Sequence, residues 1–159
     1  MYLENDDLRV SFSLQASEWT SFYDKKRQIE YAHQSDQYWA GRNPTLFPIV
    51  GKLNQETYQL KGKKYHLGNH GFARHSEFKL NSQTQKSLSL ILTDNQETRK
   101  NYPFAFRLTN TYTLEGKSMT VVTSVFNPNH DDLPFNVGAH PAFVCPLLKG
   151  EQFSNYYLK

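Results

Sequence analysis

The alternation of apolar and polar residues along this chain predicts strands. Within residues 8–15 the apolar side chains are Leu8, Val10, Phe12 and Leu14, and polar residues stand between them. An apolar side chain at every second position is typical of a strand that buries one face. The sequence therefore predicts a strand over 8–15.

Similar patterns further along predict hairpins. Residues 18–31 indicate a hairpin around the polar turn 24–27, and residues 57–60 and 64–67 indicate a short one around 61–63. Leucines at 88, 90 and 92 predict another strand. The clearest hairpin joins 104–114 to 119–125 through a turn at 115–117. No helical stripe competes, so the sequence predicts an all-β fold, an antiparallel β-sandwich.

Prolines and glycines predict an ordered loop over residues 41–51. Gly41, Pro44, Pro48 and Gly51 are spaced so that a continuous helix is forbidden while the backbone stays extended. At the other end of the chain, residues 155–159 resemble the start of a strand.

Composition narrows the class of protein. A length of 159 residues fits one domain over 1–159, and an aromatic content of 14% favours β structure. A net charge of +3 without a large basic cluster argues against nucleic acid as a partner. The single cysteine, Cys145, excludes an internal disulfide, and the sequence shows neither a leader nor a long apolar run. We therefore expect a cytoplasmic protein that does not bind membranes.

Two histidine loops are the candidates for chemistry. They read Asn69-His70-Gly71-Phe72-Ala73-Arg74 and Asn136-Val137-Gly138-Ala139-His140-Pro141-Ala142-Phe143. Glycine lets a backbone approach a ligand, imidazole exchanges a proton near neutral pH, and arginine offers a fork of donors. Each loop taken alone is also compatible with a surface turn that holds a structural histidine. The similar make-up of the two loops suggests one shared site.

These loops, together with a third motif, resemble a known family. The third motif is Arg42-Asn43-Pro44-Thr45-Leu46-Phe47-Pro48-Ile49-Val50-Gly51. The likeness covers residues 38–143 and is to the aldose 1-epimerase (galactose mutarotase-like) family, most of all to its LacX-type branch. It implies a galactose mutarotase-like supersandwich. Because members of the family are nearly twice as long, it also implies an incomplete sandwich, the N-terminal portion of that domain.

The resemblance implies an isomerase that interconverts the α and β anomers of a hexose or hexose phosphate. Ring opening needs an acid and a base but no metal or organic cofactor. The family's general acid falls on His140, and the histidine that hydrogen-bonds near the ring oxygen falls on His70. The family's general-base glutamate belongs to a C-terminal part that matches nothing here. We therefore expect little activity from this chain alone.

Three more residues are candidates for binding a small-molecule sugar or sugar phosphate. Arg42 and Arg74 can each make paired hydrogen bonds to hydroxyls or to a phosphate, as arginines of related hexose-6-phosphate epimerases do. The alternative for each is a surface arginine paired with a carboxylate. Phe72 is retained as a sugar-contacting candidate, although we favour the core for both Phe72 and Phe143.

Other interpretations remain open. His66, His70 and His75 lack a fourth ligand at a zinc spacing, so we expect no metal site. A carbohydrate-binding module without catalytic activity would use the same cleft and would need no base. An incomplete sandwich leaves strand edges without partners, and such edges predict self-association.

Overall fold

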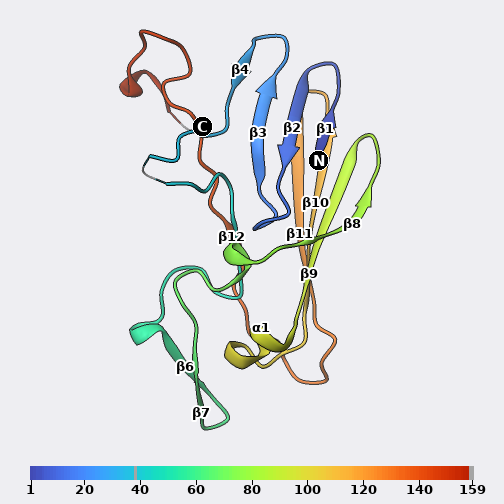
Figure 1. Ribbon diagram of the computed structural model, residues 1–159, viewed down its shortest axis with the longest axis vertical. Coiled ribbons are helices and arrows are strands. Elements are labelled where there is room, and N and C mark those ends of the chain that lie inside the picture. Colours follow the sequence, from blue (N-terminus) through green and yellow to red (C-terminus); the bar gives the residue numbers. More distant parts are fainter. Residues whose placement is uncertain (38, 158–159) are drawn as a thin grey trace.

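Two four-stranded antiparallel sheets form the body of the protein in the computed structural model, which describes residues 1–37 and 39–157 (Figure 1). The first sheet has the order β1-β2-β3-β4, with bounds Tyr2–Glu4, Leu8–Phe12, Trp19–Asp24 and Ile29–Glu30. The second has the order β11-β10-β9-β8, where β8 to β11 are Lys79–Gln83, Ser87–Thr93, Arg107–Glu115 and Ser118–Phe126.

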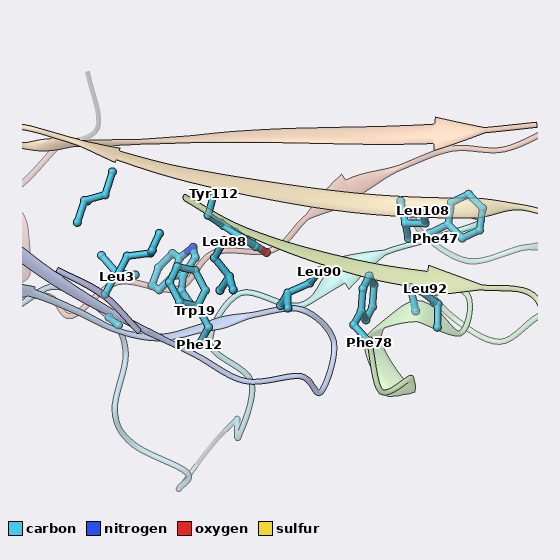
Figure 2. Close-up of a cluster of buried hydrophobic side chains, with 14 of the residues drawn as sticks. Leu3, Phe12, Trp19, Phe47, Phe78, Leu88, Leu90, Leu92, Leu108 and Tyr112 are labelled. Atoms are coloured by element: carbon cyan, nitrogen blue, oxygen red, sulfur yellow. The ribbon is translucent and has the colours of Figure 1, made fainter. Parts of the chain in front are cut away.

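The alternating apolar residues face one another between these sheets. Along β10 every second residue is buried, from Leu108 to Leu114, and the threonines between them are only half-buried. Figure 2 shows Phe12 and Trp19 of the first sheet opposite Leu88 and Tyr112 of the second. The predicted antiparallel β-sandwich is confirmed.

The predicted hairpins are present with small shifts in their bounds. β10 and β11 pair along their whole length, from Arg107↔Phe126 to Glu115↔Ser118. The short hairpin consists of β6 (Thr57–Leu60) and β7 (Lys63–His66), so its second strand starts one residue earlier than expected. β2 ends at Phe12 instead of residue 15, a bulge shifts its register with β3 between Ser11 and Phe12, and the chain then turns through Ala16 and Ser17, whose φ angles are +58° and +51°.

Some elements differ from the sequence-based expectation. The helix α1 (Gln96–Asn101) was not predicted, and among the described residues no helix is long and apolar enough to cross a membrane. The strand expected at 155–159 is wrong for its described part, where the 3₁₀ turn η3 (Phe153–Asn155) is followed by irregular backbone. Residues 158 and 159 lie outside the described residues. Two further 3₁₀ turns, η1 (Asn54–Glu56) and η2 (Ala73–His75), lie in loops.

A buried polar network ties the loop over 41–51 to the sandwich. This loop contains β5 (Thr45–Leu46), and the Asn110 side chain of β10 donates to Thr45 Oγ1 at 2.8 Å and to Ser17 Oγ at 3.1 Å. Thr123 of β11 donates to Asn110 Oδ1 at 2.8 Å. Because an unpaired buried polar group costs free energy, these bonds fix where β5 can lie.

The outer edge of β11 carries no further strand among the described residues. Val121 and Val122, at the middle of the strand, are 45% and 53% exposed. The opposite edge strand, β8, is interrupted by a bulge and begins with Lys79, two features that hinder pairing with another chain. The two edges of the second sheet are thus protected unequally.

Candidate functional site

The first histidine loop is fastened to the segment that follows β5. The carbonyl oxygen of Phe47 accepts from the backbone N–H groups of Phe72 and Ala73, at 3.0 and 3.1 Å. Gly71 has a φ of +68°, and a Cβ at this position would lie 2.4 Å from Phe47 O. Only glycine provides both this conformation and this close approach.

The second histidine loop is fastened to the same segment along β5. It contains β12 (Gly138–Ala139), which pairs with β5 through Gly138↔Leu46 and Ala139↔Thr45. The pairing continues on both sides, since the His140 N–H donates to Pro44 O at 3.3 Å and the Asn136 N–H donates to Pro48 O at 2.9 Å. The segment 42–51 therefore brings both loops together.

His70 and His140, 70 residues apart in the sequence, meet as a result. Their ring centroids are 6.5 Å apart and the rings are inclined by 70°. Both imidazoles thus lie within reach of one small ligand.

The His70 imidazole is held in one orientation. The Gly51 backbone N–H donates to His70 Nδ1 at 2.9 Å, and the backbone N–H of His70 donates to Gly51 O at 2.8 Å. Because Nδ1 accepts, the proton of the neutral ring is on Nε2. Partial burial lowers the pKa of His70, and the positive charge of Arg74 and the neighbouring His140 lower it further. His70 is therefore suited to act as a neutral N–H donor.

His140 has a different environment. The residue is exposed, and none of the described residues forms a hydrogen bond to its imidazole. The neighbours of the ring are aromatic, namely Trp39 at a centroid distance of 5.0 Å and His70 at 6.5 Å. An exposed imidazole can exchange protons with solvent or with a ligand.

The two arginines are placed differently. Arg74, half-buried in η2, is near enough to His70 to affect its pKa. The Arg42 guanidinium donates to Asp36 at 2.8 Å and to Ala40 O at 2.7 Å, and only 14% of the side chain is exposed. The structure thus places Arg74 near His70, and Arg42 holds the loop that precedes it.

The two phenylalanines also differ. Phe72 packs its ring against Phe47, Tyr102 and Phe106 of the core, at centroid distances of 6.0, 6.2 and 5.7 Å. Phe143 is 51% exposed and lies against Trp19 at 5.6 Å, so the expectation that Phe143 is in the core is wrong. Phe143 belongs to the segment that follows β12 and runs beside Ala32, just after β4 at the edge of the first sheet. This position at the edge explains its exposure.

Trp39 is the neighbour of His140 that the sequence did not predict. The only local signal for it is its place just before Gly41 and the Arg42 motif. Within the described ranges no group of three or more His, Cys, Asp or Glu side chains could hold a metal ion. The arrangement as a whole offers one fixed N–H donor, His70, and one exposed imidazole, His140.

Comparisons with known proteins agree with this architecture. The family model for aldose 1-epimerase matches residues 1–158. The protein LacX (chromosomal) of Lactococcus lactis subsp. lactis is 37% identical over 164 residues, which are 99% of this chain and 54% of that protein. The chain therefore spans about half the length of the curated relatives it matches.

Solved structures share the fold. A galactose mutarotase related enzyme from Lactobacillus acidophilus has a TM-score of 0.92 and 38% identity over 96% of this chain and 51% of its own. A galactose mutarotase-like protein from Lactobacillus casei has a TM-score of 0.86 and 33% identity over 90% and 49%. The resemblance inferred from the histidine loops and the galactose mutarotase-like fold are both confirmed. The chain belongs to the aldose 1-epimerase family.

Proposed function

We propose that this chain contributes the proton-donating side of an aldose 1-epimerase site that interconverts the anomers of a hexose or hexose phosphate. The observation that carries the proposal is the pair of imidazoles with centroids 6.5 Å apart, one fixed as a neutral donor and the other exposed. Family membership supports the reaction class.

The two histidines divide the work on the ring oxygen. His140 delivers a proton to this oxygen as the bond between it and the anomeric carbon breaks. His70 donates a hydrogen bond from Nε2–H to the same oxygen and so stabilises the charge that develops there. The anomeric hydroxyl loses its proton to a base, and no residue of this chain is assigned to that step. Rotation about the bond between C1 and C2 and reclosure then give the other anomer.

Arg74 extends the proposal to phosphorylated sugars. It lies beside His70, and a guanidinium can bind a phosphate through two parallel hydrogen bonds. Such charge-assisted bonds are about twice as strong as neutral ones, so Arg74 favours a hexose phosphate over the free hexose.

Polarimetry of freshly dissolved α-glucose tests the proposal. A positioned proton-transfer group contributes about 10² to 10⁴ in rate. We expect the wild-type chain to accelerate mutarotation above the spontaneous rate, although less than an enzyme with its own carboxylate base. His140→Asn should abolish this acceleration.

His130→Asn is the matched control, because His130 is exposed in the groove beside Lys61 and Asp131 and makes no part of the proposed site. If the wild-type chain and the His140→Asn variant give the same acceleration, the proposed role of His140 is wrong. If the wild-type chain binds hexose but leaves mutarotation at the spontaneous rate, this chain acts as a carbohydrate-binding module and the proposed proton transfer by His140 is wrong.

We also propose that the chain self-associates through the edge of β11. The strand Ser118–Phe126 contains no charged residue, and Val122 stands at its centre. Antiparallel pairing of two copies about Val122 would place Met119 opposite Val125 and Thr120 opposite Ser124. These two kinds of pair match like with like, whereas Val121 would face Thr123 and Ser118 would face Phe126. This edge therefore fits a second copy of the same strand.

A further inference from the structure

Four rings, each next to the following one, lie at the proposed site. The rings of His33 and Trp39 are nearly parallel, at a centroid distance of 6.4 Å and an angle of 24°. Trp39 is followed by His140 at 5.0 Å and His140 by His70 at 6.5 Å. The indole thus stands between His33 and the imidazole that we assign as the acid.

The position of the indole is fixed by its own loop. A Cβ at Gly41 would lie 2.4 Å from Cζ2 and 2.6 Å from Cε2 of Trp39, so the ring packs directly on the backbone there. Arg42 holds that backbone, because its guanidinium donates to Ala40 O at 2.7 Å and to Gly41 O at 3.3 Å. The requirement for glycine at position 41 therefore comes from Trp39.

His70 and His140 are oriented by different means. A hydrogen bond from Gly51 sets the His70 ring, whereas the described residues give the His140 ring aromatic neighbours and no hydrogen bond. The backbone of His140 is fixed by its bond to Pro44 O, but this leaves its side-chain torsions free. Of the two rings beside the His140 imidazole, the Trp39 indole at 5.0 Å is nearer than His70 at 6.5 Å, and so the indole is the closer packing contact that can restrain it.

We propose that Trp39 is the positioning residue for His140, holding the imidazole in the orientation from which it delivers its proton to the sugar. This inference rests on the proposed function. Misplacement of a catalytic group by about 1 Å can cost a hundredfold in rate. Removal of the indole should therefore lower kcat by up to about this factor and leave KM for the hexose unchanged.

The first experiment follows the contact itself by NMR. The ring current of an aromatic side chain shifts the NMR signals of nearby protons. The chemical shifts of His140 Hε1 and Hδ2 should therefore change when Trp39→Leu removes the indole. Trp39→Phe should keep part of the displacement, because it retains a ring. The His70 signals should stay in place in both variants, since Gly51 orients that imidazole.

Gly41→Ala tests the same point without changing Trp39. The added Cβ must push the indole away, so the His140 signals should move as they do in Trp39→Leu. Gly68→Ala is the matched control, because a Cβ there meets no atom within 4 Å. It should leave the His140 signals unchanged. A change in the His70 signals as large as that in the His140 signals of the Trp39 variants would show a general collapse of the loop and would overturn the positioning role.

The second experiment separates this inference from the proposed function. Mutarotation rates of the wild type and of Trp39→Leu are measured over a range of hexose concentrations, with Trp39→Phe as the conservative variant. A lower kcat in Trp39→Leu with partial recovery in Trp39→Phe supports the inference. Equal kcat in the wild type and Trp39→Leu, or a change in KM alone, overturns it. A wild-type chain that does not accelerate mutarotation overturns the proposed function and this inference together.

Discussion

Gly71→Ala should damage both the fold and the proposed site. Gly71 has a φ of +68°, and the atoms around it belong to backbone and to a proline ring, which cannot move aside like the end of a long side chain. A Cβ would lie 2.4 Å from Phe47 O, 2.7 Å from Phe47 C and 2.7 Å from Pro48 Cδ. The loop that carries His70 would have to move away from the segment 42–51.

The cost can be estimated from the bonds that hold this loop. A residue other than glycine in the left-handed region costs about 1 kcal/mol or more. Phe47 O accepts two backbone hydrogen bonds, from Phe72 and Ala73, and the loss of each costs about 1 kcal/mol. We therefore expect the free energy of unfolding to fall by about 3 kcal/mol, a large share of the roughly 5–15 kcal/mol typical of a domain.

Urea denaturation at constant pH measures this loss, with Gly62→Ala as the matched control. Gly62 has a φ of +77°, but a Cβ added there would meet no atom within 4 Å, so Gly62→Ala should lose only about 1 kcal/mol. The difference between the two variants isolates the contact with Phe47. If both variants lose the same free energy with unchanged m-values, the close approach does not matter and the reasoning is refuted.

Three further outcomes are expected. Because the pKa of His70 is lowered from its usual 6.5, the unfolded chain takes up a proton that the folded chain resists, so stability should fall as the pH drops below 6.5. Urea titrations between about pH 7 and 5 should show that the free energy of unfolding depends less on pH in His70→Gln than in the wild type. Val122→Lys would place two like charges opposite each other in a β11 pair, and sedimentation should show a shift to monomer at unchanged stability. Arg74→Gln should weaken binding of a hexose 6-phosphate far more than that of the free hexose in calorimetry, and equal losses would contradict a phosphate role.

The strand that the sequence shows most directly, β10, is one that buries one face. β10 alternates buried and half-buried residues over its whole length, so its period could be read directly. β8 could not be predicted, because all five of its residues are exposed and it joins the sheet through backbone pairing with β9. The helix α1 depends on a local capping box between Asn95 and Thr98 and has only one buried residue, so it has no apolar stripe to detect.

The site was predictable only as far as its motifs are local. The sequence shows that His70 and His140 each lie close to a glycine, but their meeting depends on the pairing of both loops with the segment 42–51. This long-range pairing leaves no periodic signal, and the likeness to a family supplied what spacing could not. Trp39 and the bond from Arg42 to Asp36 lie in one loop, whose contacts depend on where the second histidine loop passes.

The same segment links the interior of the sandwich to the proposed site. Asn110 is buried between the sheets, and its amide holds Thr45 of β5 and the buried hydroxyl of Ser17. Strand β5 in turn holds β12, and the Pro44 carbonyl next to it holds the backbone of His140. From Asn110 to His140 the chain of contacts consists of hydrogen bonds between groups that the fold itself positions. The placement of His140, the proposed acid, therefore depends on a polar group that the sandwich buries, and in the proposed function the core would support the site as well as the stability of the fold.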